Sequence, residues 1–166
     1  LATDTYKANF PSAAVLHDPI ETLDAEFLSK SYKPDVLLAS PECTSHSIAR
    51  GSKPGSEKSR ETAMSIIPWV DAMRPRWVVV ENVNRMKSWD RHDDLMVSLE
   101  KLGYQVNDLL LNAADFGTPQ ARKRLFLFCD QSGNTVTKED LLRIHRKNKK
   151  DARSILSKGD AYSTTP

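Results

Sequence analysis

Residues 35–47 read DVLLASPECTSHS, and this stretch carries the strongest structural signal in the chain. Residues 36–39 are a short apolar run between two prolines, which is typical of a buried strand. Cys43 follows the end of this run among small polar residues. Ligands of open α/β sheets bind beyond the carboxyl ends of the strands. The sequence therefore places a thiol where a nucleophile would stand, and a buried structural cysteine is the alternative.

The composition is that of an ordinary globular domain. The chain has 166 residues, 39% hydrophobic and 28% charged, which is enough for one domain with a core. It contains no apolar run long enough to span a bilayer and no signal-peptide pattern. Because the first residue is Leu rather than Met, we expect a fragment of a longer protein.

The cysteines and histidines show no metal-binding pattern. Cys43 and Cys129 lie far apart, and neither belongs to a Cys-x-x-Cys pair. We therefore expect neither a disulfide framework nor a zinc site, and a reducing compartment is favoured. The four histidines lack ligand spacing, so no metal site is predicted.

Charge is distributed unevenly along the chain. Residues 131–166 carry eight Lys or Arg and four Asp or Glu, a net charge of +4, whereas residues 1–130 carry a net charge of −2. A basic segment beside a near-neutral domain indicates nucleic-acid binding, and a solvated helix face explains it as well. We divide the chain accordingly into a domain over residues 1–130 and a basic segment over residues 131–166.

Hydrophobic periodicity predicts alternating helices and strands, and hence an α/β fold. We expect helices at residues 1–10, 59–73, 93–102 and 138–146, one or two helical turns within 21–31, and strands at 13–16, 36–39, 77–80, 106–111 and 125–129. Pro68 lies inside the second helix and predicts a kink or a break. Gly103 predicts the end of the helix at residues 93–102. Thr137, with Asp140 three residues later, predicts a capped start for the helix at residues 138–146.

A second polar group follows a second strand. Glu81 and Asn82 come directly after the strand at residues 77–80, one strand–helix–strand crossover beyond Cys43. Taken alone, Glu81 could be a helix cap or a surface acid. As the partner of Cys43 at the same edge of the sheet, it becomes a candidate site residue.

A third group of polar residues precedes the strand at residues 125–129. Gln120, Arg122 and Arg124 alternate at period two, so in an extended chain all three point to one face. Three long polar side chains on one face do not build a core. They suit a polar ligand or an anion.

Two further segments carry candidate binding residues. Residues 44–58 are rich in Ser, Gly and Lys and predict a long loop behind Cys43, with Arg50 among its basic residues. Such a loop suits contact with phosphates or closure as a lid, and a solvated linker is the alternative. Asp18 follows the strand predicted at residues 13–16, where a carboxylate caps the next turn or holds a ligand hydroxyl.

These motifs, in this order and spacing, resemble the DNA cytosine-5 methyltransferases. The resemblance covers the chain to about residue 130 and rests on NFP at 9–11, HD at 17–18, SPEC at 40–43, SRET at 59–62, ENV at 81–83 and GTPQARKR at 117–124. It implies an α/β, Rossmann-like S-adenosylmethionine-dependent methyltransferase fold, with a mainly parallel sheet and helices on both faces. The glycine-rich first motif is not among these residues, so we expect the fold to be incomplete. Residues 131–166 would lead toward the target-recognition region.

The resemblance also implies roles for individual residues. Cys43 would add to C6 of cytosine, Glu81 would protonate N3, and Arg124, with Arg122 nearby, would face O2. S-adenosylmethionine would be the cofactor. The cofactor-binding residues would be Asp18, Ser40, Pro41 and Thr62, and the substrate-binding residues Ser45, Arg50, Asn82 and Gln120.

One residue departs from the family pattern. Glu42 stands directly before Cys43, where the family usually has proline. A carboxylate beside a thiol disfavours the reactive thiolate, so this departure favours a non-catalytic nucleic-acid-binding paralogue as an alternative. Cytosine methylation in tRNA is another alternative, and an α/β domain that binds nothing in particular is a third.

The resemblance predicts the partners as well. The substrate would be double-stranded DNA with the target cytosine flipped out of the helix. A prokaryotic or phage modification enzyme would have a cognate restriction endonuclease as a partner and would lie in the cytoplasm, associated with the nucleoid. We expect no membrane and no metal.

Overall fold

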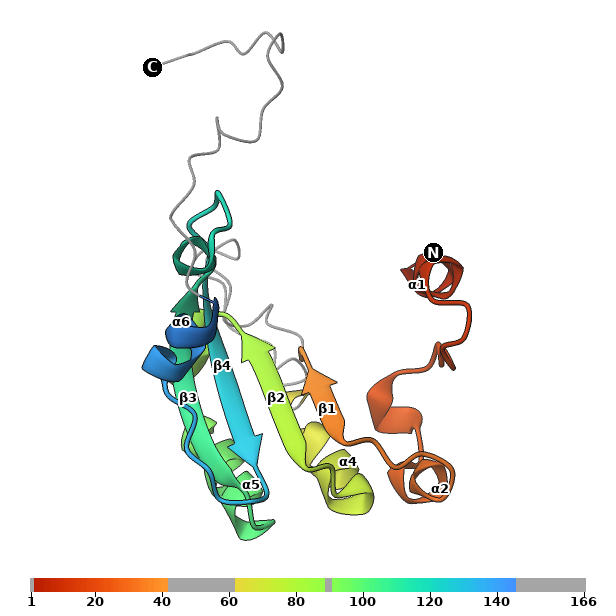
Figure 1. Ribbon diagram of the computed structural model, residues 1–166. Coiled ribbons are helices and arrows are strands. Elements are labelled where there is room, and N and C mark those ends of the chain that lie inside the picture. The colour runs from red at the N-terminus through yellow and green to blue at the C-terminus, as the bar shows by residue number, and fades with distance from the viewer. Residues whose placement is uncertain (1, 42–61, 89–90, 146–166) are drawn as a thin grey trace, which may run out of the picture.

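The structure is a computed structural model that describes residues 2–41, 62–88 and 91–145 (Figure 1). Its sheet has the strand order β1-β2-β4-β3, formed by β1 (Val36–Ala39), β2 (Trp77–Asn82), β3 (Gln105–Asn112) and β4 (Lys123–Asp130). β1 and β2 pair in parallel, whereas β4 pairs antiparallel with both β2 and β3. Three strands therefore share one direction and β4 opposes them. The expected mainly parallel α/β sheet is confirmed.

Helices lie on both faces of the sheet and beyond its β1 edge. The helices are α1 (Ala2–Asn9), α2 (Ala25–Ser29), α4 (Ile66–Met73), α5 (His92–Lys101) and α6 (Lys138–His145), with 3₁₀ turns η1 (Ile20–Thr22), η3 (Asn84–Ser88) and η4 (Ala113–Phe116). In Figure 1, α4 and α5 lie behind the sheet and α6 lies in front of β3 and β4. Among the described residues, no helix has the length and apolar character that crossing a membrane requires.

The main core lies between the sheet and the helices α4 and α5. Alternate residues of β2 and β4 are buried because successive side chains of a strand point to opposite faces. The members of this core with 1% exposure or less are Val70, Val78, Val80, Met86, Leu95, Leu99, Leu125, Leu127 and Cys129. The sheet face that carries α6 is only partly covered, and on it Leu38 is 76% exposed.

The helix predicted over residues 59–73 is interrupted before Pro68. The described part has one helical turn at residues 62–64 and a break at Ser65, and α4 then begins at Ile66. Pro68 therefore falls in the first turn of α4, where backbone N–H groups have no partner within the helix. The predicted break is confirmed. Because α4 begins only two residues before Pro68, the proline breaks no hydrogen bond within the helix.

The carboxyl ends of α4 and α5 are tied together. Arg74, at the C-cap of α4, has a φ of 49°, and its Nη1 donates to the Leu102 carbonyl at 2.7 Å. The Tyr104 hydroxyl donates to the Pro75 carbonyl at 2.5 Å. Gly103, with a φ of 92°, turns the chain out of α5 into β3, as its position predicted.

The predicted cap of α6 is also present. The Thr137 hydroxyl and backbone N–H both donate to Asp140 Oδ2, and the Asp140 N–H donates to the Thr137 hydroxyl. The hydrogen bonds from Thr137 hold the pKa of the Asp140 carboxyl below its ordinary value. This reciprocal cap fixes the start of the helix that lies over β3 and β4.

The strand predicted at residues 13–16 is wrong. These residues have no regular structure, and in Figure 1 their segment runs apart from β1, the edge strand of the sheet. A short apolar run forms a strand only where a neighbour satisfies its backbone groups. Leu16, 50% exposed, confirms that this segment does not enter the core.

We expect Leu99→Ala to destabilise the protein by about 2–5 kcal/mol, because it removes a buried side chain from the centre of the core. Leu99 has 0% exposure, whereas Val97 on the same helix is 43% exposed. The control Val97→Ala should change stability by less than about 0.5 kcal/mol. Unfolding midpoints in urea measure both, and equal shifts would contradict the described position of α5.

Candidate active site

The ends of β1, β2 and β4 bring three polar side chains together. Ala39 pairs with Val80, so Ser40, the residue after β1, lies beside Glu81 near the end of β2. β4 runs antiparallel on the other side of β2 and contributes Arg124 near its start. Ser40, Glu81 and Arg124 thus come from three adjacent strands and meet at one edge of the sheet.

Glu81 is held from both sides. The Ser40 hydroxyl donates to Glu81 Oε2 at 2.5 Å, and Arg124 Nε lies 2.9 Å from Glu81 Oε1. The side chains of Arg124 and Glu81 are 24% and 30% exposed, so the pair is partly shielded from water but open to a ligand. The predicted acid and one predicted arginine are in direct contact.

Asn82 links β2 to Pro41, the second residue after β1. Its side chain is only 4% exposed; Nδ2 donates to the Pro41 carbonyl at 3.3 Å, and Oδ1 accepts from the Val83 N–H at 2.8 Å. Both polar ends of the amide are thus engaged within the chain. This geometry gives Asn82 a structural task between the ends of β1 and β2, and its contact with substrate stays a prediction.

A pocket of about 360 Å³, here called the arginine pocket, opens beside Glu81. Its lining residues are Glu81, Leu111, Ala113, Phe116, Arg122, Arg124, Phe126, Phe128 and Leu141. Arg122 and Arg124 both line it, as expected of residues that alternate at period two, and Phe126 and Phe128 continue the same face. Gln120 is exposed and is not among the lining residues. The arginine pocket therefore combines one acid, two cations and an aromatic wall.

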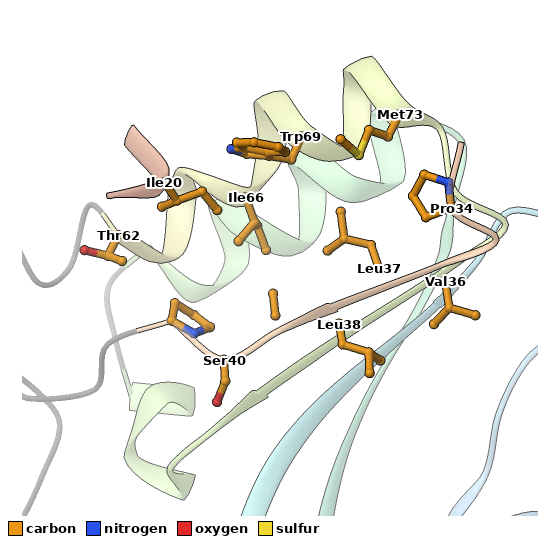
Figure 2. Close-up of a pocket in the computed structure, with 12 residues that line it drawn as sticks. Ile20, Pro34, Val36, Leu37, Leu38, Ser40, Thr62, Ile66, Trp69 and Met73 are labelled. Atoms are coloured by element: carbon orange, nitrogen blue, oxygen red, sulfur yellow. The ribbon is translucent and has the colours of Figure 1, made fainter. Parts of the chain in front are cut away.

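A second pocket, here called the edge pocket, lies between β1 and α4 (Figure 2) and has a volume of about 550 Å³. Three of the predicted cofactor residues, Ser40, Pro41 and Thr62, line one end of it. Ile66 and Trp69 line its helix side, and Figure 2 shows Ile66 directed toward the strand. The fourth predicted cofactor residue, Asp18, is exposed and is not among the lining residues.

Three predicted site residues, Cys43, Ser45 and Arg50, lie outside the described residues. Pro41 is the last described residue before them, and it lines the edge pocket two positions before Cys43. Within the described ranges, no group of three or more His, Cys, Asp or Glu side chains is arranged to hold a metal ion.

Cys129, the other cysteine, lies in the core with 0% exposure. Burial raises the pKa of its thiol to about 12. At pH 8 we therefore expect iodoacetamide to alkylate it about a thousand-fold more slowly than an exposed thiol, because only the thiolate reacts. Peptide mass spectrometry before and after unfolding measures this. Rapid alkylation of Cys129 in the folded protein would show that β4 is not packed as described.

Sequence reasoning missed the aromatic wall of the arginine pocket and the contact made by Ser40. Phe126 and Phe128, whose ring centroids are 5.8 Å apart, lie in the strand predicted at residues 125–129, to which no binding role was assigned. Because Phe126 and Phe128 follow Arg122 and Arg124 at every second position, the sequence could have placed all four on one face of the strand. No pattern in the sequence indicated that the Ser40 side chain would form a hydrogen bond with Glu81.

Comparison with known sequences identifies the class. The family model for C-5 cytosine-specific DNA methylases matches residues 1–164. The Type II methyltransferase M1.HphI of Haemophilus parahaemolyticus is 32% identical over 142 residues, which are 81% of this chain and 38% of that protein. The Type II methyltransferase M.NlaIV of Neisseria lactamica is 33% identical over 153 residues, 84% of this chain and 34% of that protein. This chain belongs to the C-5 cytosine-specific DNA methylase family, and it spans less than two fifths of the length of these two relatives.

Solved structures share the fold. The S. pombe Dnmt2 methyltransferase superposes with a TM-score of 0.68 at 19% identity, over 91% of this chain and 45% of that one. The Entamoeba histolytica methyltransferase EhMeth gives a TM-score of 0.66 at 18% identity, over 90% and 46%. The expectation of an incomplete Rossmann-like methyltransferase fold is confirmed.

Proposed function

We propose that the complete protein transfers a methyl group from S-adenosylmethionine to C5 of a cytosine in DNA. Membership of the C-5 cytosine-specific DNA methylase family supports this, and the Glu81–Arg124 pair in the arginine pocket is the observation that carries it. Cytosine presents two neighbouring acceptors, N3 and O2. A carboxyl group that can supply a proton and an adjacent guanidinium complement that edge of the base.

The residues then have defined tasks in the reaction. The Cys43 thiolate adds to C6, which turns C5 into an enamine-like carbon able to attack an electrophilic methyl group. Glu81 favours the addition by giving a proton to N3, and Arg124, with Arg122, stabilises the charge that develops at O2. Loss of the C5 hydrogen to a base then allows the thiolate to leave.

The edge pocket is the proposed cofactor site. Its volume of about 550 Å³ falls in the ordinary range for small-molecule sites. Pro41 and Ile66 offer an apolar surface for the adenine ring, and Thr62 lies at the same end of the pocket. Asp18 is proposed to reach the adenosyl group from the segment before η1. S-adenosylmethionine supplies the electrophilic methyl group.

The substrate is proposed to be duplex DNA from which the target base is flipped, at a cost of a few kcal/mol. The substrate contacts proposed for this chain are Ser45, Arg50, Asn82 and Gln120. The named Type II relatives support a modification role, in which a restriction endonuclease of the same specificity would be the partner and the site of action a prokaryotic cytoplasm.

Covalent trapping tests this proposal. The complete polypeptide is incubated with S-adenosylmethionine and duplex DNA that contains 5-fluorocytosine, and then run on a denaturing gel. Fluorine at C5 cannot leave as a proton does, so the thioether to the cysteine persists. We expect a band of protein joined to DNA, and none with unfluorinated DNA.

The other functions correspond to other outcomes. Adducts with fluorinated tRNA but not with DNA libraries of broad sequence would assign the protein to RNA methylation. Binding to nucleic acid without an adduct on either would overturn the catalytic proposal in favour of a non-catalytic nucleic-acid-binding protein.

A further inference from the structure

We propose that Ser40 is a positioning residue for Glu81 and not a ligand of the cofactor. This inference rests on the proposed function, because it concerns how the catalytic acid is held during cytosine methylation. The carrying observation is the hydrogen bond from the Ser40 hydroxyl to Glu81 Oε2 at 2.5 Å.

The geometry of the strands directs Ser40 away from α4. Side chains alternate along a strand, so Ser40 shares a face with Val36 and Leu38, whereas Leu37 faces the helix. Figure 2 shows Leu37 directed toward α4 and the Ser40 oxygen directed away from it. Glu81 lies on the same face as Ser40, because Val78 and Val80 are the buried positions of β2. The hydroxyl is therefore presented to the acid.

The Ser40–Glu81 hydrogen bond connects the two pockets. Ser40 lines the edge pocket and Glu81 lines the arginine pocket. Arg124 holds Oε1 at 2.9 Å from the opposite side. With one donor on each oxygen, the plane of the carboxyl group is fixed, whereas a glutamate free of partners would turn about its terminal torsion. Ser40 thus provides one of the two hydrogen bonds that orient the Glu81 carboxyl group.

Ser40 and Arg124, the two donors to Glu81, differ in whether they also contact the cytosine in the proposed function. In the proposed function Arg124 also faces O2 of the cytosine, so its guanidinium is shared between the acid and the substrate. Ser40 lies on the far side of Glu81, outside the arginine pocket, and has no such second task. Ser40 is therefore the partner that holds Glu81 throughout the reaction. A hydroxyl can also donate to the ionised acid and accept from the protonated one, so it fits both states.

The test uses the complete polypeptide and four proteins: wild type, Ser40→Ala, Ser40→Thr and Ser88→Ala. Ser88 is the matched control, because its hydroxyl donates to the Arg85 carbonyl in η3 and does not contact Glu81. We expect Ser40→Ala to lower kcat about 10-fold or more, the usual consequence of losing a hydrogen bond to a charged group. The KM and the calorimetric Kd for S-adenosylmethionine should stay within about two-fold, and Ser40→Thr, which keeps the hydroxyl, should recover most of the rate.

A second background separates positioning from a general structural effect. If the Ser40 hydroxyl acts through the Glu81 carboxyl, its loss should cost little in a Glu81→Gln protein, in which the acid is already absent. The described charged groups that share the arginine pocket with Glu81 are Arg122 and Arg124, and both remain in these variants. Ser40→Ala should therefore lower the rate much less in the Glu81→Gln background than in wild type, and Ser88→Ala should lower it in neither.

Several outcomes overturn the inference. If Ser40→Ala weakens cofactor binding and leaves kcat unchanged, Ser40 is a cofactor ligand. If Ser40→Ala lowers the rate as much in a Glu81→Gln background as in wild type, the hydroxyl does not act through Glu81. If the wild-type protein is active and a variant gives any of these results, only the inference about Ser40 fails and the proposed function stands. If the wild-type protein forms no covalent adduct with fluorinated cytosine, both the proposed function and the inference about Ser40 fail.

Discussion

Cys43→Ala is expected to abolish methyl transfer and the covalent adduct with 5-fluorocytosine DNA while leaving DNA binding within about two-fold of wild type. Removal of a catalytic nucleophile commonly costs several orders of magnitude in kcat, and we expect a loss of at least about 10⁴-fold. Alanine removes only the sulfur, so the substitution deletes the nucleophile without adding bulk or charge that would oppose DNA binding. Gel trapping, a tritiated-methyl assay and a binding titration measure the three quantities.

The other cysteine provides the control for this experiment. Cys129 is buried in the core at the far end of β4 from Arg124, with a thiol whose pKa is raised to about 12. Cys129→Ala should therefore trap DNA as wild type does, after correction for the fraction of folded protein. Residual turnover in Cys43→Ala, or loss of trapping only in Cys129→Ala, would remove Cys43 as the nucleophile.

Glu81→Gln is expected to lower kcat by about 10²–10⁴-fold, the usual contribution of a positioned general acid. Glutamine keeps the size of the side chain and its capacity to accept from Ser40, but it cannot give a proton to N3. The Kd for S-adenosylmethionine should change less than about three-fold, because Glu81 lines the arginine pocket and not the edge pocket. Single-turnover rates and calorimetry measure the two effects.

The matched control is Glu100→Gln, which makes the same substitution at an exposed position of α5. It should leave both quantities unchanged. Parallel losses of rate and cofactor affinity in Glu81→Gln would show that Glu81 supports the structure and does not act as the acid.

Much of the fold could be predicted because its signals are local. The apolar run of β1 lies at residues 36–39 as predicted, and the buried face of α5 follows from the spacing of Leu95 and Leu99. The strand at residues 13–16 could not be excluded from sequence, because an apolar run gives no sign of whether a partner strand stands beside it.

The candidate site was predictable in its residue types and less so in its contacts. The resemblance implied that Glu81 and Arg124 face the same base, and the two side chains are in contact. The pairing of Ser40 with Glu81 depends on the register of β1 against β2, a long-range property that periodicity does not carry. The same holds for Asn82, whose bond to the Pro41 carbonyl joins residues 41 positions apart.

The central position of β4 has a consequence for synthesis of the protein. β4 fills the place between β2 and β3, yet it is the last of the four strands to be made. After Asn82 leaves the ribosome, residues 83–122 must follow before β4 begins at Lys123. At about 5–20 residues per second this takes about 2–8 s, during which β2 has no partner on that side. A nascent chain stalled in this interval would present an apolar strand edge, and chaperones that hold such edges should be found on ribosomes paused there.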